Sequence, residues 1–252
     1  DPKQQGGEEA SGFMDLSPRD QRAMILLVVL YLLQGVPVGL AFGTMPFLLK
    51  TKLSYGDIGF FMLCTYPYSL KLFWSPIVDS TFVNELQLPL IGKLSLGRRK
   101  SWIVPIQTIV GVMFWYLSRN VDQLLLADLP NVKLITLIFF VLILFAATQD
   151  IAVDAFRREI LSDNELGLGN AVHVNAYRIA GLIPGSLSLI LADRLPWNEV
   201  FWITGAFMLP GMAMAWLVSE PAVKGMPKTL RQAVTEPFHE FMGRQGWRGA
   251  AL

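Results

Sequence analysis

The sequence predicts an all-α membrane protein whose transmembrane part is a bundle of six helices. Of its residues, 53% are hydrophobic and only 16% are charged, and the mean hydropathy is +0.44. An ordinary soluble domain carries about a quarter of charged residues. The apolar residues also fall in long blocks that approach the ~20 residues needed to cross a bilayer. The net charge of +1 does not imply general polyanion binding, so no nucleic-acid partner is expected.

Six apolar blocks define the predicted helices. Because the connections are short, consecutive helices should be antiparallel neighbours. The fourth block must run on to about residue 153 to cross the bilayer. The blocks are residues 23–49, 58–78, 102–118, 134–149, 168–192 and 200–218.

The bundle, residues 23–220, is flanked by two segments of different composition. Residues 1–22 are polar and mixed in charge, so we expect a disordered cytoplasmic tail. Residues 221–252 combine apolar residues at helical spacing with flanking lysines and arginines, which predicts an amphipathic cytoplasmic connector on the membrane surface. A plain linker is the alternative. The apolar positions of this connector are Leu230, Val234, Phe238 and Phe241.

The lysines and arginines between the helices predict the orientation. The tail, the second and fourth connections and the C-terminal segment together carry fourteen of them, whereas the other connections carry five. Cytoplasmic loops carry the excess of positive charge, so both termini are expected in the cytoplasm.

Charged residues gather where the second, third and fourth helices reach the cytoplasm. Asp79 closes the second helix, while Gly97, Arg98 and Arg99 open the third. A carboxylate beside an arginine pair favours a charge-assisted clasp. We expect Asp154 to complete it, forming a cytoplasmic gate that latches two helix pairs. The alternative is positive-inside topology with a solvated Asp79.

Two positive charges lie inside predicted spans, at Lys71 and Arg178. Each costs about 2.5–3.5 kcal/mol at mid-membrane, so a partner is expected. They are predicted to bind an anionic substrate or to pair with Asp150, although Lys71 has snorkelling as an alternative. Asp150 and Asp154 are four residues apart and share a helix face. Two such carboxylates repel each other when ionised, which suits proton coupling at Asp150.

We prefer a division of labour between the two carboxylates, with Asp154 in the gate and Asp150 facing a cavity against Arg178. His173 is interpreted as a structural histidine rather than a proton carrier. Further polar residues are expected to bind substrate in the same cavity: Gln34, Gln149, Asn175 and Tyr177.

The middle of the fifth helix contains Gly181, Pro184 and Gly185. Small residues allow helices to approach closely, and proline bends a helix, so this segment is predicted to flex. No metal ion or cofactor is expected, since the single cysteine and two histidines show no ligand spacing. An acyltransferase would need a nucleophile or a general base. No such arrangement occurs around His173 or His239, so no enzymatic activity is expected.

Several stretches resemble the acetyl-coenzyme A transporter family of endomembranes: "YLLQGVPVGLAFGTMPFLL", "SYGDIGFF", "YPYSLKLFWSPIVDS", "GRRKSWIVPIQ", "YLSRNVDQLL" and "AATQDIAVD". Others are similar to the AmpG-type bacterial muropeptide permease, namely "AFRREILSDNELGLGNAVHVNAYRIAGLIPGSLSLILAD" and "MPKTLRQAVTEPFHEFMGRQGW". Both families belong to the major facilitator superfamily, and together the stretches cover residues 23–252. The sequence departs from the superfamily pattern in the insertion "STFVNELQLPLIGKLSL" and at Pro76, where the pattern has glycine.

The resemblance implies twelve helices in two halves that alternate access to a central cavity, with this chain as the N-terminal half. A missing C-terminal half or a homodimer partner is therefore implied, together with membrane lipid. The implied substrate is acetyl-CoA in the endoplasmic reticulum membrane. The alternative is proton-coupled import of anhydro-muropeptides through a bacterial inner membrane. An alternative of another class is a membrane scaffold or non-transporting half-transporter.

Overall fold

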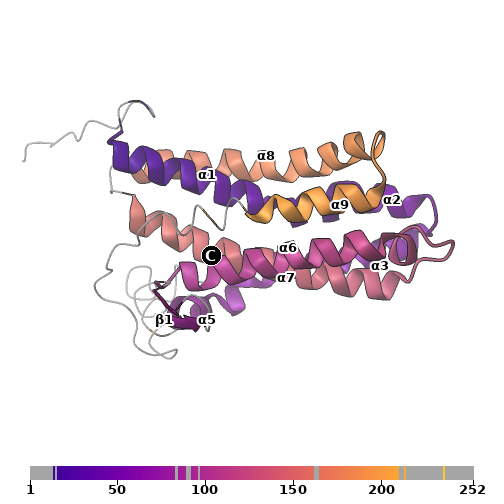
Figure 1. Cartoon of the computed structure of the whole chain (residues 1–252), viewed down its shortest axis with the longest axis horizontal. Coiled ribbons are helices and arrows are strands. Elements are labelled where there is room, and N and C mark those ends of the chain that lie inside the picture. The colour runs from indigo at the N-terminus through magenta and orange to yellow at the C-terminus, as the bar shows by residue number, and fades with distance from the viewer. Residues whose placement is uncertain are drawn as a thin grey trace, which may run out of the picture.

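The computed structural model describes residues 14, 16–82, 85–88, 92–95, 97–161, 165–209, 213 and 235. Within these residues the membrane part is helical, and its long helices lie alongside one another (Figure 1). The predicted connector, residues 221–252, lies outside the described residues except for position 235. It therefore stays a prediction.

The first predicted span is a continuous helical rod of three segments: α1 (Pro18–Gly39), the π-helical turn η2 (Leu40–Thr44) and α2 (Met45–Lys50). The rod begins five residues earlier than expected because the Ser17 side chain caps it, accepting a hydrogen bond from the Asp20 amide at 3.2 Å. Residues 18–22, which the sequence assigns to the tail, are therefore helical, and the tail itself stays a prediction. Pro46 has no amide proton to donate, and the rod widens in the turn before it.

The second predicted span is a succession of short segments instead of one long helix. They run α3 (Tyr55–Phe61), η3 (Met62–Thr65), α4 (Tyr66–Leu70), η4 (Lys71–Phe73) and α5 (Ser75–Ser80). Pro67 and Pro76 each stand at the start of a segment, where the missing amide proton costs least. This row of segments packs along α7.

The remaining helices are α6 (Lys100–Leu124), α7 (Val132–Ile160), α8 (Leu166–Ala192) and α9 (Trp197–Ala206). Within the described residues, four helices are long and apolar enough to cross a membrane: Pro18–Lys50, Lys100–Leu124, Val132–Ile160 and Leu166–Ala192. The sixth predicted span begins with α9, and its end lies outside the described residues. Six spans therefore remain a prediction.

The insertion between Asp79 and Gly97 contains a β-hairpin, which its sequence does not predict. Strands β1 (Glu85–Leu88) and β2 (Gly92–Ser95) pair antiparallel, with Glu85 opposite Ser95. The hairpin lies beside α5 at one end of the bundle (Figure 1). Gly97 follows it with φ at 75°, a left-handed conformation that glycine adopts without strain.

Helices α1 and α8 meet along a line of small residues, here called the glycine seam: Gly35, Gly39, Gly43, Ala180 and Gly185. A Cβ atom added to Gly185 would lie 2.7 Å from the Gly39 carbonyl oxygen, and one on Gly35 would lie 2.2 Å from the Ala180 Cβ. These positions tolerate only the smallest side chains.

Hydrogen bonds reinforce the seam where α8 passes η2. The Thr44 hydroxyl donates to the Gly185 carbonyl at 2.9 Å and lies 2.6 Å from the Ser188 hydroxyl. Gly185 is thus a packing residue, and α8 continues as helix through Pro184. Flexing at Gly181, Pro184 and Gly185 stays a prediction.

Candidate functional site

Three carboxylates at successive depths along α7 form what we call the carboxylate ladder: Asp150, Asp154 and Glu159. The helix extends to Ile160 because its apolar run is followed by good helix formers, so all three lie within it. At ~1.5 Å rise per residue, Asp150 lies about 15 Å from the end of α7. Each carboxylate binds side chains from a different set of segments.

Asp150 is the deepest rung. One of its carboxylate oxygens is ion-paired with the Lys71 ammonium from η4, and the other accepts a hydrogen bond from the Gln34 amide of α1 at 2.5 Å. The Asp150 side chain is 2% exposed and that of Lys71 is 34% exposed. A carboxylate this deep in a membrane span is tolerated when its charge is paired and hydrogen-bonded.

The sequence favours Arg178 as the partner of Asp150, with Lys71 as an alternative partner. The structure places Lys71 against Asp150. η4 turns the Lys71 side chain toward α7, and the ammonium also lies 5.1 Å from the centre of the Tyr68 ring. The Lys71 ammonium therefore pairs with Asp150 within the site, so Lys71 does not simply snorkel to the membrane surface.

Asp154 is the middle rung and joins α7 to α1 and α8. It accepts a hydrogen bond from the Tyr31 hydroxyl at 2.8 Å, and the same oxygen lies 3.4 Å from Nδ1 of His173 and 3.8 Å from the Arg157 guanidinium. The Tyr31 and His173 rings stack with centres 4.6 Å apart. Asp154 is thus found against Tyr31, His173 and Arg157, whereas the sequence places it in the clasp, and a part of Asp154 in gating stays a prediction.

Glu159 is the outermost rung and takes the place predicted for Asp154. Arg99 bridges two carboxylates, with 2.7 Å to Asp79 and 2.7 Å to Glu159. Arg98 lies 3.9 Å from the Asp79 carboxylate and 3.6 Å from Glu159. The left-handed turn at Gly97 sets up both arginines at the start of α6. The predicted cluster of Asp79, Arg98 and Arg99 thus exists, and its role as a gate stays a prediction.

The other predicted substrate-binding residues are not gathered around the ladder. Arg178 is exposed on α8 and has no hydrogen-bond or ion-pair partner among the described residues. Asn175 is exposed and donates to the Ala171 carbonyl of its own helix at 2.8 Å. Gln149 is buried, and its side-chain nitrogen has no hydrogen-bond partner within the described part of the chain. The side chain of Tyr177 lies outside the described residues.

Sequence reasoning missed Glu159 as a member of the ladder, and it missed the contacts of Tyr31 and His173 with Asp154. Ligand atoms of Asp150, Asp154 and His173 lie within 4.8 Å of one another, a grouping that spacing along the chain did not indicate. Lys71 and Arg157 stand beside these carboxylates and supply the positive charge that a metal ion would otherwise bring. The donor set therefore favours internal ion pairs over a metal centre.

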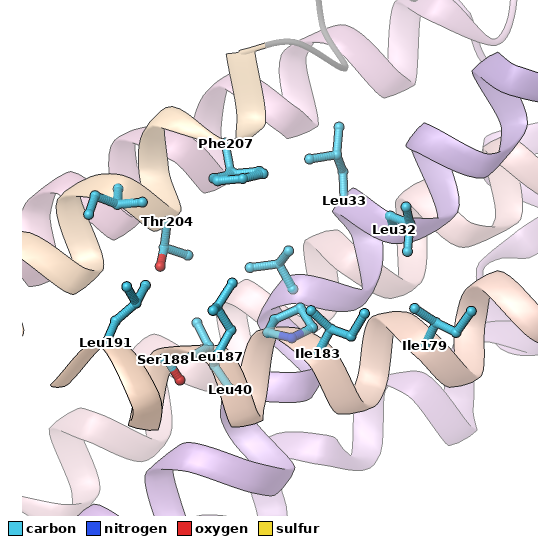
Figure 2. A pocket seen from close by; sticks show the side chains of 13 residues that line it. Leu32, Leu33, Leu40, Ile179, Ile183, Leu187, Ser188, Leu191, Thr204 and Phe207 are labelled. Atoms are coloured by element: carbon cyan, nitrogen blue, oxygen red, sulfur yellow. The ribbon is translucent and has the colours of Figure 1, made fainter. Parts of the chain in front are cut away.

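A separate apolar groove of about 240 Å³ lies between α1, α8 and α9. Figure 2 shows aliphatic side chains of α8 and α1 and the Phe207 ring facing this space. Its two hydroxyls are already engaged: Ser188 donates to the Gly185 carbonyl at 2.9 Å, and Thr204 donates to the Val200 carbonyl at 2.7 Å. The groove thus offers little to a charged molecule, and the ladder remains the candidate site.

The chain is similar to one family of transporters and to several curated proteins. A family model described as acetyl-coenzyme A transporter 1 matches residues 23–183, more than half of the chain. An uncharacterized protein of Haemophilus influenzae is 40% identical over 89% of this chain and 50% of its own length. An uncharacterized membrane protein of Saccharomyces cerevisiae is 35% identical over 80% of this chain and 36% of its own length. The anhydromuropeptide permease of Escherichia coli is 30% identical over 87% of this chain and 42% of its own length. The chain thus spans half or less of the length of these curated relatives.

Proposed function

The chain belongs to the acetyl-coenzyme A transporter family, and we propose on that premise that it forms the N-terminal half of a major facilitator transporter. In this proposal it moves acetyl-CoA across a membrane by alternating access. Its four long apolar helices support a membrane location. The similar proteins whose descriptions name an activity are transporters and permeases, so we propose no catalytic reaction.

The observation that carries the proposal is the rung formed by Asp150, Lys71 and Gln34. These residues come from α7, η4 and α1, and they meet inside the apolar part of the bundle. Replacing a buried ion pair by well-packed apolar residues is often neutral or stabilising. A polar cluster therefore stabilises helix packing no better than apolar residues would. A pathway for a charged solute, by contrast, needs polar groups at this depth.

Acetyl-CoA carries phosphates, and two cationic groups support an anionic substrate. The Arg178 guanidinium is exposed and has no partner among the described residues, while Lys71 keeps a third of its side chain accessible beside Asp150. A guanidinium presents paired donors that match phosphate and carboxylate oxygens. Cationic walls do not separate acetyl-CoA from a muropeptide, and the family model is our reason for proposing acetyl-CoA.

The outer rung supports a gate in this proposal. Arg99, at the start of α6, bridges Asp79 at the end of α5 and Glu159 near the end of α7. It therefore connects three helices on one side of the bundle. Charge-assisted pairs at a partly solvated helix end can open and re-form during a cycle. We place this gate and both termini in the cytoplasm from the distribution of lysines and arginines.

A six-helix half encloses only part of a central pathway, so a second half is needed. It would be the rest of a longer protein or a second copy of this chain. The endoplasmic reticulum membrane is the proposed location for an acetyl-CoA transporter.

The second candidate function is import of anhydro-muropeptides with protons, through a bacterial inner membrane. The observation that favours it is the similarity to the E. coli anhydromuropeptide permease. In that case Asp150 would take part in proton coupling.

The test is uptake of labelled acetyl-CoA into proteoliposomes made with the longest reading frame that contains this chain. We expect saturable uptake that excess anhydro-muropeptide does not reduce. Proton-driven muropeptide uptake without acetyl-CoA uptake would select the second function. If neither compound enters, the protein is better described as a membrane scaffold or a non-transporting half.

A further inference from the structure

We propose that α6 and α9 together bind the phosphate of a phospholipid headgroup, at the membrane surface opposite the Arg98–Arg99 clasp. The site is a hollow of about 580 Å³, here called the aromatic pocket. The proposal is independent of the transported substrate. The pocket is lined by Val112, Trp115, Tyr116, Arg119 and Trp202.

The position of the pocket along α6 places it at an interface. At ~1.5 Å rise per residue, Arg119 lies about 28 Å from Lys100, which is close to the ~30 Å thickness of the hydrocarbon core. Lys100 stands at the clasp end of α6. When that end is at one edge of the hydrocarbon core, the backbone of Arg119 is therefore near the other edge, from which its long side chain can extend to the phosphates.

The side chains match the chemistry of a headgroup. Arg119 is exposed and has no hydrogen-bond or ion-pair partner among the described residues, so its guanidinium can offer two parallel donors to a phosphate. Trp and Tyr rings favour this interfacial depth, because each has an apolar body and a polar edge. Val112 lies about 10 Å deeper along α6 and is exposed, where the acyl chains of the same lipid would begin.

The pocket is held in shape by contacts between the two helices. The Trp115 indole donates to the Trp202 carbonyl at 3.2 Å, and the Ser118 hydroxyl donates to the Asn198 carbonyl at 2.6 Å. A Cβ atom on Gly205 would lie 2.5 Å from the Trp115 ring, so the helices pack tightly here. A preformed site loses little freedom when a ligand binds.

A phospholipid explains the pocket better than free phosphate does. One exposed guanidinium in water gains little from a small anion, since exposed ion pairs contribute ~0–1 kcal/mol. A phospholipid adds apolar contact with the three rings and Val112, and its phosphate is already concentrated at this depth. The apolar wall and the single cation thus select a molecule that has both parts.

The test compares lipid binding by the full reading frame, purified in detergent and stripped of lipid. Phosphatidylglycerol, a galactolipid without phosphate and inorganic phosphate are added separately, and lipid retention is measured by native mass spectrometry together with the unfolding temperature. We expect preferential retention of phosphatidylglycerol, and about a fivefold reduction of that preference in Arg119→Gln. Arg194→Gln is the matched control, because Arg194 is an exposed arginine in the α8–α9 connection, near the start of α9.

Four outcomes would overturn the proposal. They are equal retention of phospholipid and galactolipid, equal preference in wild type and Arg119→Gln, an equal loss in Arg194→Gln, or stabilisation by inorganic phosphate that matches the phospholipid. If Arg119→Gln lowers the unfolding temperature before lipid is added, Arg119→Lys decides: it keeps the charge and should retain part of the preference.

Discussion

The carboxylate ladder and the glycine seam both join α1 to its neighbours, and they do so by different physics. Along the seam, α1 and α8 touch backbone to backbone, and added Cβ atoms on Gly35 and Gly185 would overlap their neighbours. Along the ladder, α7 is tied to α1, η4, α8 and the start of α6 by ion pairs and hydrogen bonds. The seam has one well-packed arrangement, whereas the ladder consists of contacts that can be exchanged for a substrate, a proton or water.

This difference indicates which parts of the bundle move together. Helices whose backbones touch directly resist sliding, so α1 and α8 should behave as one body along the glycine seam. Contacts between charged groups at a partly accessible site can have two arrangements. A conformational cycle would therefore change the ladder and leave the seam intact.

The largest effect is expected when the negative charge of Asp150, the deepest carboxylate of the ladder, is removed. Asp150→Asn leaves the Lys71 ammonium without its partner inside the membrane span. We expect transport to fall more than tenfold and the free energy of unfolding to fall by about 2–3 kcal/mol, because Lys71 is partly exposed and buried pairs cost ~3–5 kcal/mol to break. Uptake and unfolding temperature in the same detergent measure the two effects.

A double variant separates function from structure at this rung. Asp150→Asn combined with Lys71→Gln removes both charges and should recover most of the stability while transport stays low. Recovery of transport as well would show that the pair serves only to hold helices together.

The seam can be tested with one methyl group. Gly185→Ala places a Cβ 2.7 Å from the Gly39 carbonyl oxygen, so α1 and α8 must separate. We expect a loss of about 1–2 kcal/mol in the free energy of unfolding. Gly181→Ala is the matched control, because a Cβ there has no atom within 4 Å. Equal effects of the two variants on the unfolding temperature would contradict a seam held by close packing.

The smallest effect is expected at the outer rung. Arg99→Lys keeps the charge and loses the planar fork that bridges Asp79 and Glu159, so we expect about 1 kcal/mol of lost stability. The same substitution at Arg158, an exposed arginine of α7, is the control and should change nothing. If the clasp is a gate, Arg99→Lys should also increase labelling of a cysteine placed behind it, and unchanged labelling would count against gating.

Much of the helical organisation could be predicted because apolar blocks are a strong signal of membrane spans. The second span was harder, since its composition is apolar while Pro67 and Pro76 interrupt its hydrogen bonds. The hairpin was missed because one short two-stranded insertion leaves little periodicity to detect.

The residue types of the candidate site could be predicted better than the pairs that these residues form across helices. Intramembrane charges identified Lys71 and Asp150, and helical spacing placed Asp150 and Asp154 near each other. Pairing across helices depends on their relative rotation, which spacing along one helix does not contain. Two polar side chains could have been suspected from the sequence: Glu159 directly follows the arginine pair at the end of α7, and Tyr31 lies one turn before Gln34 on the same helix.

The π-helical turn η2 has a geometric consequence for the glycines of α1. An α-helix has 3.6 residues per turn, so residues repeated every four positions drift by about 40° at each step around the axis. Gly35, Gly39 and Gly43 have this repeat, and in an unbroken α-helix the third would rotate away from α8. The wider turn at Leu40–Thr44 takes more residues to complete a revolution and so offsets the drift. The π-helical turn thus restores the rotational position of Gly43 on the helix. Gly43 still faces Gly185, and a Cβ atom added to Gly43 would lie 3.4 Å from the Gly185 Cα.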